Sequence, residues 1–227
     1  MTFPPMMTHA SALSATLTPV SDATISIIAP SMNFGHDNTL SVEYQSSRQI
    51  SRALIRFNLA AALPSNAVID SAWLNLKLEG GQGSGSLTIY LVTQDWIEGQ
   101  VTWDSQPTVG EPILSRPCDT TTGVKGLEIT DIVRAWHNTP HYGLEIRGPE
   151  GGVAYIRLFE SREHGEYPPT LSVIYHLPSP SPSPTPTPLP TQAPTQPPVP
   201  TPTAGPTQGW CCLNGEVFQT TQAICSL

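Results

Sequence analysis

Residues 72–78 read A-W-L-N-L-K-L, with an alanine or a leucine at every second position. Successive side chains of a β-strand point to opposite faces of the sheet, so a period of two places one face of such a strand against a core. A helix would instead need apolar residues three and four positions apart. We therefore predict that this stretch is a half-buried β-strand.

The same period recurs on both sides of residues 72–78. The runs are L-S-V-E-Y at 40–44, A-L-I-R-F at 53–57, L-T-I-Y-L-V at 87–92, V-A-Y-I-R-L-F at 153–159 and L-S-V-I-Y at 171–175. Helical spacing is found in I-T-D-I-V-R-A-W at 129–136. Many short strands with one short helix predict an all-β fold, an antiparallel β-sandwich of the jelly-roll type, over residues 21–177.

Proline marks the end of this domain. Residues 177–208 hold 13 of the 25 prolines, and the segment opens with a run of Ser-Pro and Thr-Pro pairs. Proline fixes φ and has no backbone donor, so residues 178–208 are predicted to form an extended polyproline linker of roughly 3.1 Å per residue. We expect a flexible N-terminal arm (1–20) before the domain and a small cysteine-rich tail (209–227) after the linker.

The tail contains Cys211, Cys212 and Cys225, while Cys118 stands alone in the domain. A segment this short cannot bury a core and is normally held by a cross-link. Asn214-Gly215 between two apolar runs is typical of a β-hairpin turn. We favour a disulfide to Cys225 from Cys212, or from Cys211, in an oxidising compartment, because a zinc site would need a fourth ligand at suitable spacing.

The composition limits the partners and the location. The formal net charge is −8 and only 12% of the residues are charged. Nucleic acid or an anionic membrane surface would need a basic patch, so neither is expected as a partner. No run of about 18 apolar residues predicts a membrane span. The first residues lack the basic start of a signal peptide, but Ser/Thr-Pro linkers are typical of secreted and cell-surface proteins, so we expect an extracellular location.

Several phrases of the domain match one known pattern. They are N-F-G at 33–35, S-R-A-L-I-R-F-N-L at 51–59, D-W-I-E-G-Q-V-T-W-D-S-Q-P at 95–107, T-D-I-V-R-A-W at 130–136 and F-E-S-R-E at 159–163. In these phrases the chain resembles the DNRLRE-domain family of secreted and surface proteins of bacteria and archaea, over roughly residues 21–176. The resemblance implies a jelly-roll β-sandwich outside the cell. Some members are carbohydrate-binding modules, with alginate as one ligand type, and the resemblance supplies no catalytic residues.

The leading hypothesis is therefore a non-catalytic module that binds polysaccharide, since the sequence contains neither G-x-S-x-G nor H-E-x-x-H. Ten basic residues in an acidic chain fit a neutral or mixed glycan better than a polyuronate. The alternative is a structural subunit of a cell-surface fibre, adhesin or wall assembly. Two features motivate it. Residues 10–20 form an uncharged β-capable arm that could pair with a neighbour's sheet edge and give self-association. The disulfide tail could cross-link or dock at the far end of the linker.

Tyrosine and arginine side chains on strand surfaces are the predicted sugar contacts, because they supply stacking faces and forked donors for hydroxyl groups. Trp96, Trp103 and Trp136 lie within the family phrases and are interpreted as core or loop-anchoring residues. The predicted carbohydrate-binding residues are Tyr44, Arg56, Tyr90, Tyr155 and Arg157.

Two of these residues have a second interpretation. Phe159 lies on the same strand face as Tyr155 and Arg157, so if Phe159 belongs to the core, both point inward and Arg157 becomes a paired structural arginine, with Glu163 as a partner. No cofactor is expected. A structural calcium ion between loops is left open, with Asp22, Asp37 and Asp104 as its candidate ligands.

Overall fold

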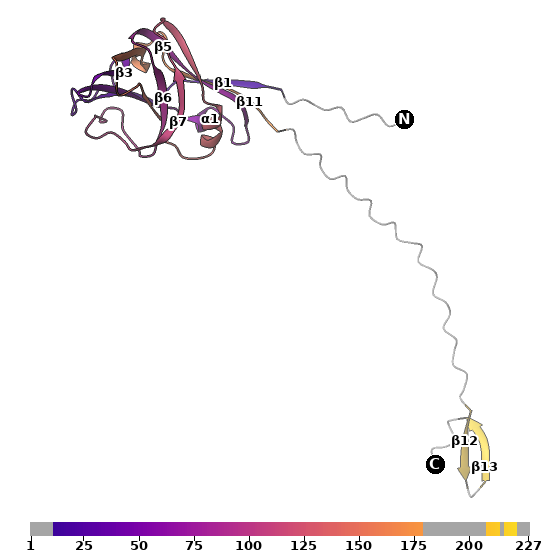
Figure 1. The fold of residues 1–227 in the computed structure, drawn as a ribbon. Helices are drawn as coiled ribbons and strands as arrows, with labels where there is room; N and C mark the ends of the chain where they lie inside the picture. Colours follow the sequence, from indigo (N-terminus) through magenta and orange to yellow (C-terminus); the bar gives the residue numbers. More distant parts are fainter. Residues whose placement is uncertain (1–10, 179–207, 214–215, 222–227) are drawn as a thin grey trace, which may run out of the picture. The chain divides into compact units, whose positions relative to one another are not determined.

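The computed structural model describes residues 11–178, 208–213 and 216–221 (Figure 1). These residues belong to two units, which divide after Pro180. Within the described part of the chain, no helix is long and apolar enough to cross a membrane.

The first unit is an antiparallel sheet of eleven strands with short helical elements. The strands are β1 (Leu13–Leu17), β2 (Ser21–Ser26), β3 (Thr39–Ser46), β4 (Gln49–Arg56), β5 (Val68–Gln82), β6 (Ser86–Val92), β7 (Val109–Pro117), β8 (Gly123–Glu128), β9 (Leu144–Arg147), β10 (Tyr155–Glu160) and β11 (Thr170–His176). The helical elements are α1 (Thr130–Trp136) and two 3-10 turns, η1 (Leu59–Ala61) and η2 (Arg162–His164).

The sheet follows the order β1-β11-β5-β10-β3-β4-β9-β6-β7, with β2 paired to β4 and β8 paired to β5. The fifteen-residue β5 has β8 along one edge and β11 followed by β10 along the other. The sheet curls on itself into a half-barrel that resembles a sandwich (Figure 1). The all-β antiparallel prediction and the one short helix are confirmed for residues 11–178, while the jelly-roll topology stays a prediction.

The main core lies inside the curl. Leu74, Leu76 and Leu78 of β5 are fully buried, as their period of two predicts, and they pack with Leu144 and Ile146 of β9 in one cluster. Helix α1 packs against β5. It buries Val133 and Trp136, which confirms the structural interpretation of that tryptophan.

A smaller cluster lies under the loop between β6 and β7. Trp96 and Val101 of this loop pack on Leu54 and Ile25, and Trp103 packs against the same cluster. The indole nitrogen of Trp96 donates a hydrogen bond of 2.8 Å to the carbonyl of Tyr142. Two of the tryptophans that the sequence places in the family phrases therefore anchor this loop.

The N-terminal boundary differs from the expected one. Leu13–Leu17, expected within a flexible arm, form β1 and pair with β11 of the same chain, with Leu13 opposite Tyr175 and Leu17 opposite Leu171. The physical reason is the alternation of Leu13, Ala15 and Leu17 with Ser14 and Thr16, which gives this segment one apolar face, of which Ala15 and Leu17 pack on the core.

The second unit contains β12 (Gln208–Leu213) and β13 (Glu216–Thr221), which pair antiparallel with Leu213 opposite Glu216. Cys225, the Asn214-Gly215 turn and linker residues 179–207 lie outside the described residues. The disulfide between Cys212 and Cys225 and the polyproline linker therefore stay predictions.

Candidate functional site

A row of side chains on β5 points away from the core. Trp73, Asn75 and Lys77 alternate with the buried leucines and therefore lie on the outer face of the sheet. Trp73 is 44% exposed, which is unusual for a tryptophan in the middle of a sheet. This face is the first candidate site.

The neighbouring strands leave room for the Trp73 indole. In the register of β5 and β8, Gly126 stands opposite Asn75. A Cβ placed on Gly126 would lie 3.3 Å from Cε3 of Trp73, so the indole packs over this glycine while much of it stays open to solvent. The absence of a side chain at Gly126 therefore lets Trp73 lie against the sheet.

Small polar groups lie beside the indole. On β11, Ser172 pairs with Trp73 and Thr170 pairs with Asn75. The amide nitrogen of Asn75 donates to Ser172 Oγ at 3.1 Å and to Thr170 Oγ1 at 3.4 Å. Among the contacts of residues 11–178, no donor reaches Asn75 Oδ1, so this half-buried oxygen is left to accept from solvent or a ligand.

Tyr167 provides a second exposed aromatic ring on this face. It is 49% exposed, and Lys77 Nζ lies 4.8 Å from the centre of its ring. The backbone N–H of Tyr167 donates to Glu160 Oε2 at 2.9 Å, and Pro168 restricts the chain that follows. A surface hollow of about 360 Å³ lies here, lined by Asn75, Lys77, Val124, Glu166, Tyr167, Pro168 and Thr170.

These residues have the chemical groups that bind a sugar. We call them the Trp73 face (Trp73, Asn75, Lys77, Tyr167, Thr170 and Ser172). Flat rings offer an apolar surface to the C–H face of a sugar, and amide and hydroxyl groups exchange hydrogen bonds with sugar hydroxyls. The face holds no pair of carboxylates across a cleft, among the residues described, that would suit glycoside hydrolysis.

The predicted residues Tyr155 and Arg157 lie elsewhere and are fully buried. Phe159 is buried too, so the inward interpretation of this strand applies. Arg157 donates to the carbonyls of Gln82 and Gly83, each at 2.9 Å, and also to Cys118, rather than pairing with Glu163. Their burial argues against a surface role, because a ligand would have to displace these hydrogen bonds.

Arg56 also has a structural role, because its guanidinium holds the loop that carries Asp95 and Trp96. It forms an ion pair of 2.6 Å with Asp95 and lies 5.0 Å from the centre of the Trp96 ring. It borders a surface hollow of about 590 Å³, the Arg56 hollow, where Trp136 and His141 stack with ring centres 4.3 Å apart. Burial is the main cause that lowers the pKa of His141 below its usual value, and the positive charge of Arg56 lowers it further. Both causes favour the neutral form of this ring.

The remaining predicted tyrosines are half-buried and separate. Tyr90 lies under the Arg147 guanidinium, 4.3 Å from the ring centre, and Arg147 is paired with the buried Glu145. Tyr44 lies on β3, where it pairs with Ile50 and Tyr155. The five predicted residues therefore do not form one surface, and their role in binding stays a prediction.

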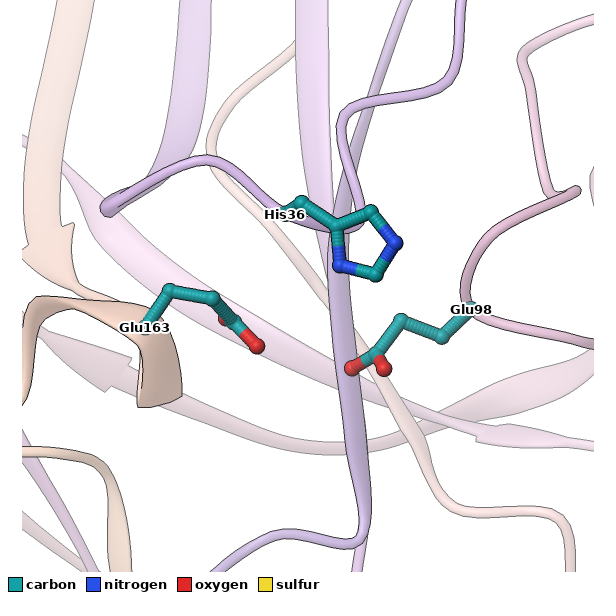
Figure 2. A group of neighbouring side chains, drawn as sticks. All are labelled: His36, Glu98 and Glu163. Carbon is teal, nitrogen blue, oxygen red and sulfur yellow. The ribbon is translucent and has the colours of Figure 1, made fainter.

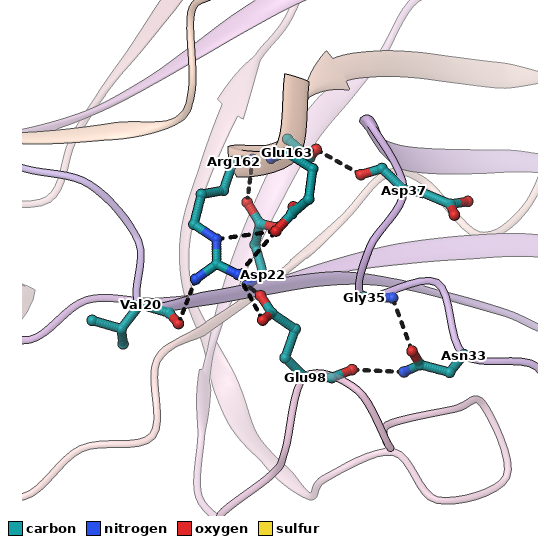
Figure 3. Close-up of polar contacts among 9 residues, drawn as sticks. Val20, Asp22, Asn33, Gly35, Asp37, Glu98, Arg162 and Glu163 are labelled. Atoms are coloured by element: carbon teal, nitrogen blue, oxygen red, sulfur yellow. Dashed lines mark hydrogen bonds and ion pairs between the residues drawn. The ribbon is translucent and has the colours of Figure 1, made fainter. Parts of the chain in front are cut away.

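Polar side chains also converge where β2, the loop between β6 and β7 and the turn η2 meet, in what we call the carboxylate cluster (Asp22, Glu98, Arg162 and Glu163; Figure 3). The Arg162 guanidinium contacts Glu98 Oε2 at 2.7 Å and Glu163 Oε1 at 2.9 Å, and it donates to the Val20 carbonyl. Asp22 Oδ2 accepts from the Arg162 backbone N–H at 2.9 Å, and Glu98 Oε1 accepts from the Asp22 N–H at 2.7 Å. The Arg162 guanidinium thus pairs with two carboxylates, while its backbone N–H binds the carboxyl group of Asp22.

The loop before β3 is hydrogen-bonded to the loop that carries Glu98 of the carboxylate cluster. The amide nitrogen of Asn33 donates to the carbonyls of Glu98 and Val101 at 2.6 and 2.7 Å, while its oxygen accepts from the Gly35 N–H (Figure 3). A Cβ on Gly35 would lie 2.3 Å from the Glu98 carbonyl oxygen, so only glycine fits. The N-F-G, D-W-I-E and F-E-S-R-E phrases therefore meet in this cluster.

Asp22 is the electrostatically strained member of the cluster. It is 1% exposed, and burial raises its pKa to about 7, with the nearby charges of Glu163 and Glu98 adding to the rise. Burial also acts on Glu163, but the hydrogen bond and charge of Arg162 hold the pKa of Glu163 below its usual value. Asp22 is therefore the carboxyl group of the cluster that keeps its proton towards neutral pH, while Glu163 is ionised.

A group beside the cluster has ligand types suited to a cation. His36, Glu98 and Glu163 point toward one another, each with a ligand atom within 4.8 Å of the others (Figure 2). Of the predicted calcium ligands, Asp22 belongs to the cluster, Asp37 contributes a carbonyl that accepts from Ser161, and Asp104 is exposed on another loop. Calcium prefers oxygen ligands, and Arg162 already neutralises two of these carboxylates, so the calcium site stays a prediction.

The model of carbohydrate-binding module family 96 matches residues 13–175, from the start of β1 to Tyr175 in β11. The chain belongs to this family. Carbohydrate binding is therefore the function of the fold that carries the Trp73 face. The search of curated proteins found no match. The finer identification as a DNRLRE-domain protein stays a prediction within family 96.

Sequence reasoning did not single out the Trp73 face. A signal for half of it was present, because Trp73, Asn75 and Lys77 occupy the positions between the buried leucines in residues 72–78. Tyr167 lies on a loop outside any alternation, and its place beside Lys77 depends on the pairing of β5 with β11. No pattern in the sequence indicates that contact.

Proposed function

We propose that this protein is a non-catalytic extracellular module that binds polysaccharide through the Trp73 face. The observation that carries the proposal is the Trp73 indole, which lies over Gly126 and stays 44% exposed on the sheet of a family 96 module. Leaving a large apolar ring in water is costly, and a sugar ring would cover it. The Ser/Thr-Pro linker supports the extracellular location.

The Arg56 hollow is larger, but its chemistry suits a sugar less well. Its indole, Trp136, is only 6% exposed and is covered by His141, so no aromatic face is free for stacking. Arg56 is held by Asp95 and by the carbonyl of Trp96. Arg56 Nε and His141 Nδ1 have no hydrogen-bond partner among the described residues, but both atoms are buried and out of reach of a ligand, which favours the Trp73 face.

The alternative of a structural subunit drew one of its two motives from an N-terminal arm that was free to reach a neighbour. Because Leu13–Leu17 pair with β11 of their own chain, that segment no longer motivates self-association. Binding of a glycan therefore remains the better supported function, and the assembly hypothesis gains nothing from the described residues.

The test compares three variants of the full chain on a panel of soluble and insoluble polysaccharides, using affinity electrophoresis and pull-down. Trp73→Ala removes the stacking surface and is expected to weaken binding about 30-fold, the effect of losing one aromatic hot spot of about 2 kcal/mol. Tyr167→Ala is expected to weaken binding by roughly tenfold. His141→Ala, in the Arg56 hollow, is the matched control and should bind like the wild type.

Two outcomes would contradict the proposal. Binding that survives Trp73→Ala but is lost in His141→Ala would move the site to the Arg56 hollow. Release of reducing ends from any bound polysaccharide by the purified protein would contradict the non-catalytic role. Melting temperatures of all variants are measured beside the binding, so that unfolding is not mistaken for loss of a contact.

A further inference from the structure

We propose that the ligand of the Trp73 face is an uncharged polysaccharide chain that lies along β5 and β11 and contacts both aromatic rings. This inference rests on the proposed function and adds the class of glycan and the direction of the chain. It is carried by the spacing of the two rings, the neutral groups between them and the balance of charge around them.

The spacing of the rings requires a chain rather than a single sugar. Trp73 and Lys77 are four residues apart on one strand, which is about 13 Å at 3.3 Å per residue. Tyr167 lies under Lys77, at that far end of the row. This length of strand exceeds the width of one pyranose ring, so a ligand that covers the row from Trp73 to the Lys77 end must contain several linked sugars.

The groups between the rings are neutral. Asn75 stands midway along the row, with Oδ1 open as an acceptor, and the hydroxyls of Thr170 and Ser172 lie beside it on β11. Amide and hydroxyl groups exchange hydrogen bonds with sugar hydroxyls without requiring a charge on the sugar. The line from Trp73 through Asn75 to Tyr167 follows β5, so the glycan chain follows the strands.

The charges around the face disfavour an acidic glycan. Lys77 is accompanied by three exposed or half-buried carboxylates, Glu79, Glu128 and Glu166. The adjacent hollow on the α1 side has Arg116 and Arg134, but it also has Asp70, Glu128 and Asp131. Recognition of uronate carboxylates needs forked arginine donors that are free of acidic partners. A polyuronate would meet net negative charge along the whole row.

The experiment titrates the full chain with two sets of probes. The neutral set contains mixed-linkage β-glucan, xylan and galactomannan, each with its oligosaccharides of two to six units, and the acidic set contains alginate and polygalacturonate. We expect at least one neutral polymer to bind and both polyuronates to bind at least tenfold more weakly. Since no ion pair forms, the affinity should change less than twofold between 50 and 500 mM salt.

The length series and the variants test the direction of the chain. Hexasaccharides of the bound polymer are expected to bind at least tenfold more tightly than disaccharides, because only a longer chain reaches both rings. Trp73→Ala and Tyr167→Ala should each reduce this preference for length, whereas His141→Ala should leave it unchanged.

The possible failures are distinct. Tight polyuronate binding that Trp73→Ala abolishes would overturn the uncharged ligand and leave the proposed function standing. A disaccharide that binds as tightly as a hexasaccharide would overturn the extended chain. If no probe bound, or if Trp73→Ala bound every probe like the wild type, the proposed function itself would be contradicted.

Discussion

The Trp73 face and the carboxylate cluster use polar residues in opposite ways. In the cluster, Arg162 and the carboxylates satisfy one another and the surrounding backbone, and Asp22 is almost fully buried. On the face, Asn75 Oδ1 and much of the Trp73 ring remain open to solvent. The difference teaches that the dense group of charged residues holds separate segments of the chain together. The surface with few charges is the one suited to a ligand.

Asp22→Asn should have the largest effect, on how folding stability depends on pH. The pKa of Asp22 is about 7 in the folded protein and 3.8 as its ordinary value, so between these values the unfolded chain releases a proton that the folded protein keeps. Stability conferred by the wild-type residue therefore falls as pH rises through this window, by about 4 kcal/mol at most. The variant lacks this loss and should be more stable than the wild type at pH 8, but not at pH 4, in urea unfolding.

Asp104→Asn, at an exposed carboxylate, is the control for this titration and should follow the wild type at both pH values. A variant that became less stable than the wild type as pH rose would contradict the assignment. The same titration with calcium or EDTA tests the predicted ion, because a bound cation would stabilise ionised Asp22 and remove the loss at pH 8.

Arg162→Met should destabilise the protein by about 2–3 kcal/mol, because it leaves the carboxylates of Glu98 and Glu163 without their cation at a position where the Arg162 side chain is only partly exposed. Thermal and urea unfolding measure this effect, with Arg48→Met at an exposed arginine as the control. Glycan affinity of the folded protein should not change. A loss of affinity at unchanged stability would make the cluster part of the binding site and break the comparison.

Gly126→Val tests the Trp73 face, as Arg162→Met tests the carboxylate cluster. A Cβ at 3.3 Å from the Trp73 ring, with two methyl groups beyond it, should tilt the indole off the sheet. We expect about tenfold weaker glycan binding, or about 1.4 kcal/mol, with unchanged melting temperature. Gly80→Val is the matched control, because a Cβ there meets no atom within 4 Å. Equal affinity of the two variants would show that the seating of Trp73 is unimportant.

Lys77→Met should have the smallest effect. The ammonium lies 4.8 Å from the Tyr167 ring, and an exposed contact of this kind contributes about 0.5–1 kcal/mol, so affinity for a neutral glycan should fall by about two- to fivefold. Isothermal titration calorimetry measures the change, with Lys125→Met as the control, since Lys125 pairs with Asp119 instead. A loss of a hundredfold or more would mean that Lys77 holds a negative charge on the ligand.

The sequence predicted the strands better than the surfaces that they build. Alternation over residues 72–78 correctly gave β5, and the same rule shows why Tyr155 and Arg157 face inward with Phe159. The rule cannot supply partners, because Gly126 reaches Trp73 only through the pairing of β5 with β8. The carboxylate cluster was hidden for the same reason, since Asp22 bonds to a residue 140 positions away.

The position of β11 gives the molecule a mechanical property. This strand lies between β1 and β5, carries Thr170 and Ser172 at the Trp73 face, and ends at His176, just before the proline-rich segment. Tension applied to the chain beyond His176 would pull β11 lengthwise, so the ladders to both neighbours would resist in shear, with many hydrogen bonds loaded together. A module held to its glycan at β5 and β11 would thus carry tension through adjacent strands, without passing the force through the rest of the half-barrel.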